Sequence, residues 1–302
     1  MRRGPCVIFN MNILDELKQG KVLLSDGALG TLLQARGMQP GECPELWNIT
    51  HKKDLTEIAE AYLNAGSEII TTNTLGGTRL KLSQYGLGDR VSELNQIAGS
   101  ICRDVAGKLK HVAGSVGPTG KMLIMGDVTE AELYDGFCEQ AIALEKGGAD
   151  IIIIETMSAL DEAKLAVKAA RENTRCTIII TMTFSKDMKG DYFTMMGVSP
   201  SEMVSSMKEA GAHIVGSNCG NGIEDMTGIV KAIRAADNNI PVIIQANAGT
   251  PQYVEGKTIF RESPELMASF VPELIKSGAN IIGGCCGTTP EHIREIARVL
   301  ER

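Results

Sequence analysis

The sequence predicts an α/β protein, a single (β/α)8 barrel formed by residues 1–302 as one domain. Three observations predict this fold. Eight short runs rich in β-branched residues alternate with segments of helical periodicity. The centres of these runs are uninterrupted apolar tracts, as in the four isoleucines at 151–154, which is typical of parallel strands covered on both faces. Glycine-containing junctions, such as Gly147-Gly148, end a helix and lead into the next strand.

The expected strands cover 22–26, 68–73, 111–117, 151–155, 177–184, 213–219, 241–247 and 280–286. Between them, the helices have recognisable start signals. Capping boxes predict helix starts at Thr129 and Ser199, and Thr289 followed by Pro290 opens the last helix in a similar way. An open, doubly wound sheet is the alternative fold. It is disfavoured because no Gly-x-Gly-x-x-Gly motif opens the first helix.

Composition and charge exclude several functional classes. The chain is 43% hydrophobic and 22% charged, with a formal net charge of −7. A negative chain is a poor nucleic-acid binder, because binding to phosphates requires a basic face. No apolar run approaches the roughly 18 residues of a membrane helix, and the patch at 6–9 is shorter than the apolar region of a secretory signal. We therefore expect a cytoplasmic protein, with residues 1–13 as a disordered or packed extension and translation starting at Met1 or Met11.

Polar residues gather where the expected strands end, which in a barrel of this kind is the functional face. These residues are Asp26, Thr72, Asn73, Glu155, Thr156, Thr183, Asn218, Cys219, Asn247, Cys285 and Cys286. Each of them alone is explained as a turn or cap residue. Their convergence on one face indicates a site.

Three of the eight cysteines lie at the ends of two expected strands that flank a common neighbour: Cys219 ends the sixth strand, and Cys285 and Cys286 end the eighth. Because strands lie about 4.8 Å apart, the two strand ends are expected roughly 10 Å from each other, within reach of a shared metal ion. Three thiolates favour zinc and leave one coordination position open, as in catalytic sites. Such a centre suits the attack of a sulfur nucleophile on an activated methyl group. Buried small side chains are the alternative explanation for these cysteines, and the favoured one for Cys6, Cys102, Cys138 and Cys176.

None of the four histidines is expected to act as a general base. His51, His111, His213 and His292 fall away from the strand ends and are expected to be surface or helix residues.

The chain resembles the homocysteine S-methyltransferase family, and most closely the homocysteine-binding module of cobalamin-dependent methionine synthases. The matching segments lie at 26–31, 72–74, 117–120, 155–156, 218–219, 247–249 and 283–290, the last reading Gly-Gly-Cys-Cys-Gly-Thr-Thr-Pro. The resemblance implies a zinc-bearing barrel with Cys219, Cys285 and Cys286 as ligands and catalytic centre.

The resemblance also implies an amino-acid substrate held near Gly27, Ala28, Thr72 and Asn73. Asp26 and Glu155 suit its ammonium, and backbone amides after Asp26 or at Thr156 suit its carboxylate. Asn247 is expected to shape the vacant side of the metal. The folate, cobalamin and activation domains of the full synthases do not occur in these 302 residues, so any corrinoid is expected on a separate protein.

Three functions remain open at this point. The first is methyl transfer from a corrinoid protein to homocysteine, giving methionine. The second is a substrate-specific methyltransferase of an anaerobic demethylase acting on a methyl ether or methylamine, which Met157, Met195 and Met196 would suit as less polar pocket walls. The third is a non-catalytic zinc-binding subunit.

Overall fold

The computed structural model describes residues 12–254 and 257–301. Eight parallel strands form one sheet in the order β1-β12-β9-β8-β5-β4-β3-β2. Their bounds are β1 Leu23–Leu24, β2 Ile69–Thr71, β3 His111–Val116, β4 Ile151–Met157, β5 Thr177–Met182, β8 Ile214–Asn218, β9 Val242–Ala246 and β12 Ile281–Gly284. Each lies within or overlaps one of the eight predicted segments, so the prediction of strand–helix alternation is confirmed.

The barrel closes between its first two strands. A parallel bridge joins Ser25 to Ile69, and the N–H of Asp26 donates to the carbonyl of Ile69 at 3.0 Å. The N–H of Glu68 donates to the carbonyl of Leu24 at 2.7 Å. A closed (β/α)8 barrel is therefore confirmed, and the open, doubly wound alternative is wrong.

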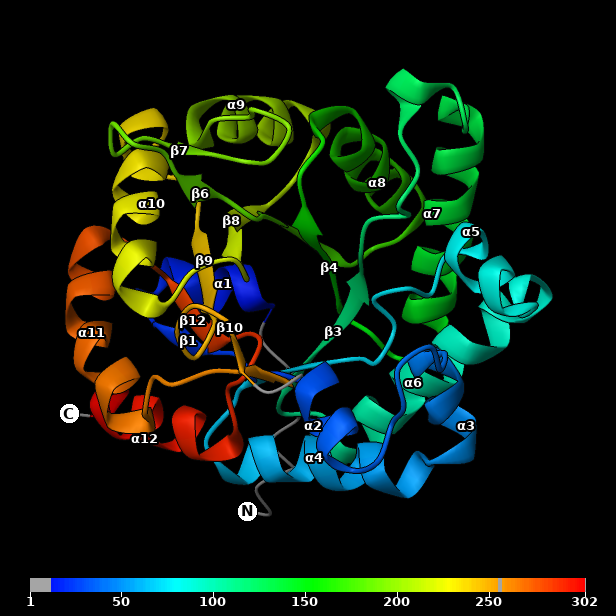
Figure 1. Ribbon diagram of the computed structural model, residues 1–302, viewed down its shortest axis with the longest axis horizontal. Helices are drawn as coiled ribbons and strands as arrows, with labels where there is room; N and C mark the ends of the chain where they lie inside the picture. Colours follow the sequence, from blue (N-terminus) through cyan, green and yellow to red (C-terminus); the bar gives the residue numbers. More distant parts are fainter. Residues whose placement is uncertain (1–11, 255–256, 302) are drawn as a thin grey trace, which may run out of the picture.

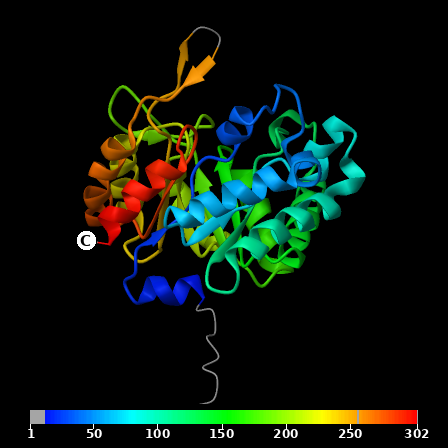
Figure 2. The same ribbon diagram turned by 90° about the horizontal axis from the view of Figure 1, so that it is seen from below.

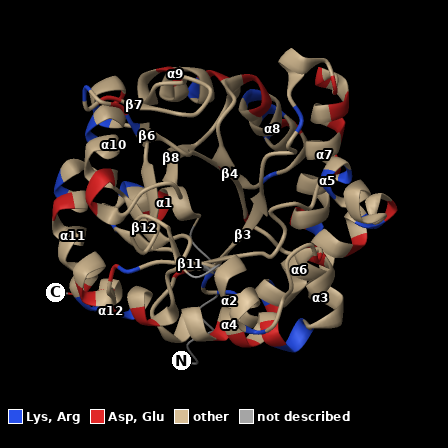
Figure 3. Cartoon of the chain, viewed as in Figure 1, with Lys and Arg blue, Asp and Glu red and all other residues tan. Residues whose placement is uncertain are grey.

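Helices surround the barrel and cover the outer face of every strand (Figure 1). They are α4 Lys52–Asn64, α6 Val91–Ala106, α7 Glu130–Lys146, α8 Leu160–Asn173, α9 Pro200–Ala210, α10 Ile223–Ala236, α11 Pro264–Ser277 and α12 Pro290–Leu300. The predicted capping boxes at Thr129 and Ser199 are confirmed, and Thr289 makes a third with His292. Lys, Arg, Asp and Glu mix on the outer helices, and the barrel strands carry few of them (Figure 3).

Shorter elements occupy the connections. The helices are α1 Ile13–Lys18, α2 Gly30–Ala35, α3 Trp47–Thr50 and α5 Arg79–Leu82, with single 3-10 turns at Pro44–Leu46, Ser83–Tyr85, Gly88–Arg90 and Leu123–Met125. Two hairpins, β6 Ser185–Lys186 with β7 Tyr192–Phe193 and β10 Gln252–Val254 with β11 Lys257–Ile259, follow β5 and β9. No helix in the described ranges is long and apolar enough to cross a bilayer.

The interior of the barrel is apolar at its base. Helix α1 lies beneath the barrel, on the side opposite the β10–β11 hairpin (Figure 2). Its Ile13 and Leu17 pack against inward-facing side chains of the eight strands, including Leu23, Ile153 and Ile243. Residues 1–11 of the expected N-terminal extension, with Cys6 and both candidate start methionines, lie outside the described residues.

Further along the strands, the inward positions become polar because side chains alternate between the two faces of a strand. These positions hold Ser25, Thr71, Ser115, Glu155, Thr181, Asn218 and Gln245. The apolar base therefore carries a polar layer on top, directly below the C-terminal ends of the strands.

The expectation for the histidines is partly wrong. His111 is a buried strand residue at the base, and its Nε2 lies 2.7 Å from Glu16 Oε1, because the half-buried carboxylates of Glu16 and Asp150 can pair with an imidazole there. His292 lies in a helix as expected but is buried, since its ring completes the cap of α12.

Candidate metal and substrate site

A pocket of about 450 Å³ opens at the C-terminal ends of the strands. Ten of the eleven residues that the sequence analysis assigned to the metal or the substrate line it: Asp26, Gly27, Ala28, Thr72, Asn73, Glu155, Thr156, Cys219, Cys285 and Cys286. The eleventh, Asn247, is buried immediately after β9 and does not line the pocket. Thr183 and Asn218, which were named only as polar strand ends, do not line it. None of the histidines contributes to the wall.

The three cysteines form one cluster. Cys219 follows β8, the Cys285–Cys286 pair follows β12, and the three sulfurs all lie within 4.8 Å of one another. The sulfurs of Cys219 and Cys286 are 3.9 Å apart. Both adjacent cysteines reach the cluster because the strand ends at Gly284 and the chain then turns, with Gly287 at φ +80°.

The protonation of the cluster indicates what it can hold. Hydrogen bonds from the thiols of Cys285 and Cys286 lower the pKa of Cys219 to about 3. The Cys219 thiolate in turn raises the pKa of Cys286 to about 11 and that of Cys285 well above its ordinary value. Without a cation, a second negative charge in the cluster is therefore opposed by the first. Ionising all three sulfurs requires a positive ion among them, as a soft divalent metal provides.

A buried oxygen beside the cluster also suits a metal. The Oδ1 atom of Asn247 has no hydrogen-bond partner in the described part of the chain, and the side chain hydrogen-bonds Cys219. A buried acceptor without a partner is costly, so this oxygen marks a place where a ligand or ion would be stabilised. The donor set therefore fits a thiolate-bound metal.

Two carboxylates face the same pocket. Asp26 accepts from the N–H of Thr71 at 2.6 Å and from its hydroxyl at 2.9 Å. Glu155 accepts from the hydroxyl of Ser115 at 2.5 Å. Burial raises the pKa of Asp26 to about 6 and that of Glu155 to about 7, and the charge on Asp26 adds to the effect on Glu155. A cationic ligand between them would relieve both costs.

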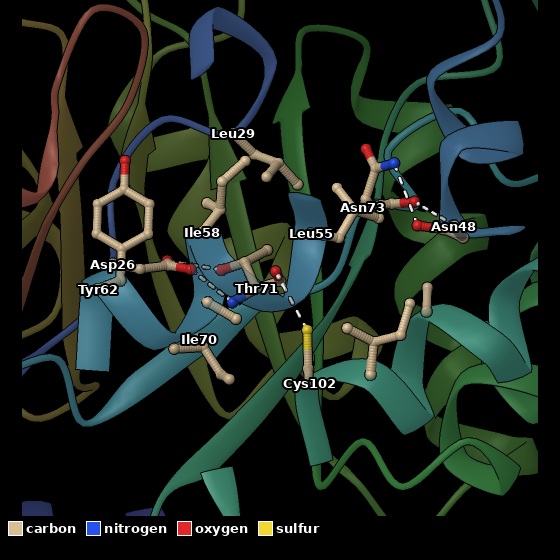
Figure 4. Close-up of a pocket in the computed structure, with 13 residues that line it drawn as sticks. Asp26, Leu29, Asn48, Leu55, Ile58, Tyr62, Ile70, Thr71, Asn73 and Cys102 are labelled. Carbon is tan, nitrogen blue, oxygen red and sulfur yellow. Dashed lines mark hydrogen bonds between the residues drawn. The ribbon is translucent and has the colours of Figure 1, made fainter. Parts of the chain in front are cut away.

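A small cavity of about 20 Å³ lies next to Asp26, between strand β2 and helices α4 and α6, and is close to the volume that one water molecule needs (Figure 4). Apolar residues of α4, such as Leu55 and Ile58, and the buried Cys102 line it. The Asp26 carboxylate turns toward Thr71 in this region, which shows that its position is set by the neighbouring strand β2 (Figure 4).

Four predicted contacts are already used within the protein. The N–H of Thr156, expected to receive a carboxylate, donates to Asn218 at 2.8 Å, and the N–H of Ala28 donates to Thr288 at 3.0 Å. The hydroxyl of Thr72 lies 2.6 Å from that of Thr74. The amide of Asn73 donates to the carbonyl of Pro44. It also donates to Asn48, which lies beside it in Figure 4. Those groups hold the loops in place, so the N–H of Thr156, one of the two alternatives for the substrate carboxylate, is already occupied by Asn218. The N–H of Gly27 has no partner in the described ranges.

Sequence reasoning did not assign a role to the polar layer. Ser115, Thr181 and Gln245 were missed, and Asn218 was noted only as one polar strand end. The available signal is a polar residue at an inward position of an otherwise apolar strand. Asn218 is the most connected of them, since its side chain contacts Thr156, Thr181, Glu155 and Cys285.

The family model described as homocysteine S-methyltransferase matches residues 23–300. The chain is 32% identical over 309 residues to the methionine synthase of Mycobacterium tuberculosis (strain ATCC 25618 / H37Rv), covering 96% of this chain and 25% of that protein. The methionine synthase of Mycobacterium leprae (strain TN) is 29% identical, covering 97% and 25%. The chain thus spans about a quarter of the length of these curated relatives.

Solved structures share the fold. The metallated form of the homocysteine methyltransferase MmuM from Escherichia coli aligns with a TM-score of 0.77 and 22% identity, over 94% of this chain and 98% of that one. The carboxyl transferase domain of Rhizobium etli pyruvate carboxylase, solved with oxamate and biotin, aligns with a TM-score of 0.54 and 15% identity, over 93% of this chain and 47% of that one.

Proposed function

Since the chain belongs to the homocysteine S-methyltransferase family and is a methyltransferase, we propose that it transfers a methyl group to the thiol of homocysteine, giving methionine. The observation that carries the proposal is the meeting of three sulfurs within 4.8 Å beside two carboxylates that line the same pocket. The sulfurs suit a metal and a thiol, and the carboxylates suit an ammonium. A small amino acid with a thiol carries both groups.

We assign Cys219, Cys285 and Cys286 as the ligands of a zinc ion, with Asn247 beside the coordination position that stays open for the substrate thiol. When bound, zinc would lower the pKa of the substrate thiol, so that the sulfur is present as a nucleophilic thiolate near neutral pH. In the transfer the sulfur forms the new bond to the methyl carbon, the thiol proton goes to solvent, and the donor keeps the electron pair of the bond that breaks.

Asp26 and Glu155 orient the substrate by accepting hydrogen bonds from its ammonium. Burial raises the pKa of both carboxyl groups, which disfavours their ionised forms. A paired ammonium offsets this, because it stabilises the negative charges. The unpartnered N–H of Gly27 is the remaining backbone donor of the predicted set and suits the carboxylate of the substrate.

We propose that the methyl donor is a methylated corrinoid carried by a separate protein. Large apolar side chains are exposed on the segments that surround the pocket: Leu75, Tyr85, Met122, Ile124, Met125, Phe193, Met195, Met196 and Tyr253. An apolar rim of this kind is typical of a surface that contacts another protein. A partner docked there would bring the donor to the open end of the pocket.

The methionines that suggested the methyl ether or methylamine alternative lie outside the pocket wall. Met157 is fully buried in the core, Met195 and Met196 are exposed, and none of the three lines the pocket. The third alternative, a non-catalytic zinc subunit, is set aside because the family is one of methyltransferases.

The test compares wild type with Cys219→Ala and with Cys138→Ala, which removes a half-buried thiol outside the cluster. We expect wild type and Cys138→Ala to copurify with about one zinc per chain and to form methionine from homocysteine and methylcobalamin. Cys219→Ala should lose most of the zinc and the activity while keeping its circular dichroism spectrum. Equal zinc content in all three proteins would refute the assignment of the cysteines as metal ligands. A zinc-loaded wild type that forms no methionine would refute the proposed reaction.

A further inference from the structure

The side-chain amide of Asn218 lies between the Glu155 carboxylate and the cysteine cluster. Its Nδ2 atom is 3.4 Å from Oε2 of Glu155 and 3.9 Å from the sulfur of Cys285. Asn218 is fully buried and ends strand β8, which brings it to the mouth beside the metal-binding cysteines. The same side chain therefore touches the carboxylate assigned to the substrate ammonium and a sulfur assigned to the metal.

The orientation of the amide is determined by its other partners. Its Oδ1 atom accepts from the N–H of Thr156 at 2.8 Å and from the hydroxyl of Thr181 at 2.7 Å. The Nδ2 atom donates one of its N–H groups to the hydroxyl of Thr156 at 2.8 Å. An asparagine amide has two N–H groups, so the second is the one that faces Glu155 and Cys285.

Backbone strain is concentrated at the same place. Thr156 at φ +62° and Cys219 at φ +60° are the two non-glycine residues with positive φ among those that the structure describes. Left-handed backbone is unfavourable for a threonine, and it persists where surrounding contacts hold it. Asn218 supplies two of those contacts to Thr156 and immediately precedes Cys219.

We propose that Asn218 is a positioning residue that fixes the Glu155 carboxylate relative to the metal-binding cysteines, so that the ammonium and the thiol of one substrate molecule are held together. The inference rests on the proposed function. It requires that homocysteine binds with its ammonium at Glu155 and its sulfur at the cysteine cluster. Because Asn218 acts through Glu155, its contribution to affinity should depend on the presence of the ammonium.

The experiment measures dissociation constants by calorimetry on zinc-loaded protein, for homocysteine and for 4-mercaptobutanoate, which is homocysteine without the ammonium. Wild type should bind homocysteine more tightly. In Asn218→Ala, the preference for homocysteine should fall about tenfold, because a hydrogen bond to a charged group is lost, while 4-mercaptobutanoate binds within about twofold of wild type. In Glu155→Gln, adding Asn218→Ala should change the preference little further, since the two residues act on one contact.

Asn280→Ala is the matched control. It removes an asparagine amide at the opposite end of the barrel, where Oδ1 accepts from Arg234 and from the N–H of Val242, and this residue does not line the pocket, so the preference of the variant for homocysteine should equal that of wild type. Zinc content and the thermal midpoint are measured for every variant. If Asn218→Ala does not fold, Asn218→Ser, which also loses the reach to Glu155, replaces it in the same comparison.

Equal weakening of both thiols in Asn218→Ala would show a merely structural role and overturn the proposal, as would an unchanged preference. A wild type that binds the two thiols equally would also overturn it, because the ammonium contact would be absent. A wild type that binds homocysteine selectively but forms no methionine would refute the proposed reaction. The comparison of the two thiols would then still test the role of Asn218.

Discussion

Glu155→Gln should change the stability and the affinity of the protein in opposite directions. The substitution keeps the size of the side chain and removes a negative charge that burial disfavours, since the pKa of Glu155 is raised to about 7 from an ordinary value of 4.5. A raised carboxyl pKa means that the folded protein binds the proton more tightly than the unfolded chain. Stability is therefore lost as the pH rises from 4.5 through 7.

The magnitude follows from that pKa. At about 1.4 kcal/mol per pH unit, ionising Glu155 costs the folded protein about 3 kcal/mol at pH 8. Glutamine avoids this cost and can still accept from Ser115, but its NH₂ group meets the Nδ2 donor of Asn218, at a cost of about 1 kcal/mol. We expect Glu155→Gln to be about 2 kcal/mol more stable than wild type at pH 8 and no more stable at pH 4.5.

The affinity should fall because the ammonium of homocysteine loses a charged partner. We expect the dissociation constant to rise tenfold or more, with zinc content unchanged. Urea denaturation at pH 4.5 and pH 8 gives the stability, and calorimetry gives the affinity.

Glu162→Gln is the control for this substitution. Glu162 is also a buried glutamate with a raised pKa, bound by the N–H and hydroxyl of Thr119, but it does not line the pocket. The affinity of the Glu162→Gln variant for homocysteine should match that of wild type. The reasoning is refuted if Glu155→Gln binds homocysteine as tightly as wild type, or if it unfolds more easily than wild type at pH 8.

Two further predictions concern stability at the base and in the wall of the barrel. Burial acts to lower the pKa of His111, but hydrogen bonds with Asp150 and Glu16 outweigh it and raise the pKa. His111→Gln should therefore cost about 1–3 kcal/mol at pH 6, and the cost should fall as the pH rises through the raised pKa of the imidazole; a cost that stays the same over a series of pH values in urea denaturation would contradict this. A Cβ atom on Gly216 would overlap the carbonyl oxygen of Ile243 on the neighbouring strand. Gly216→Ala should therefore lower the free energy of unfolding by about 3 kcal/mol or more. An unchanged thermal midpoint would contradict this, because it would show that the strands separate without cost.

Local patterns in the sequence were sufficient for the architecture. The apolar tract at 151–154 became the buried centre of β4, and the capping boxes at Thr129 and Ser199 begin α7 and α9. These features depend on residues a few positions apart, whose preferences are expressed in the sequence itself. The meeting of Cys219 with Cys285 and Cys286 was also predictable, because the order of strands in a closed barrel brings the ends of β8 and β12 to the two sides of β9.

Side-chain partners across the barrel were decided by the tertiary structure alone. The sequence places Thr72, Asn73 and Thr156 at strand ends but does not show that their polar groups are used to hold loops and the amide of Asn218. It likewise does not show that His111 is buried against Glu16. Hydrogen bonds of this kind join residues tens of positions apart, and their geometry depends on the closure and register of the whole sheet. The sequence by itself therefore determined the barrel and the residues gathered at its mouth, whereas the folded chain determined which of them face the pocket with a free polar group.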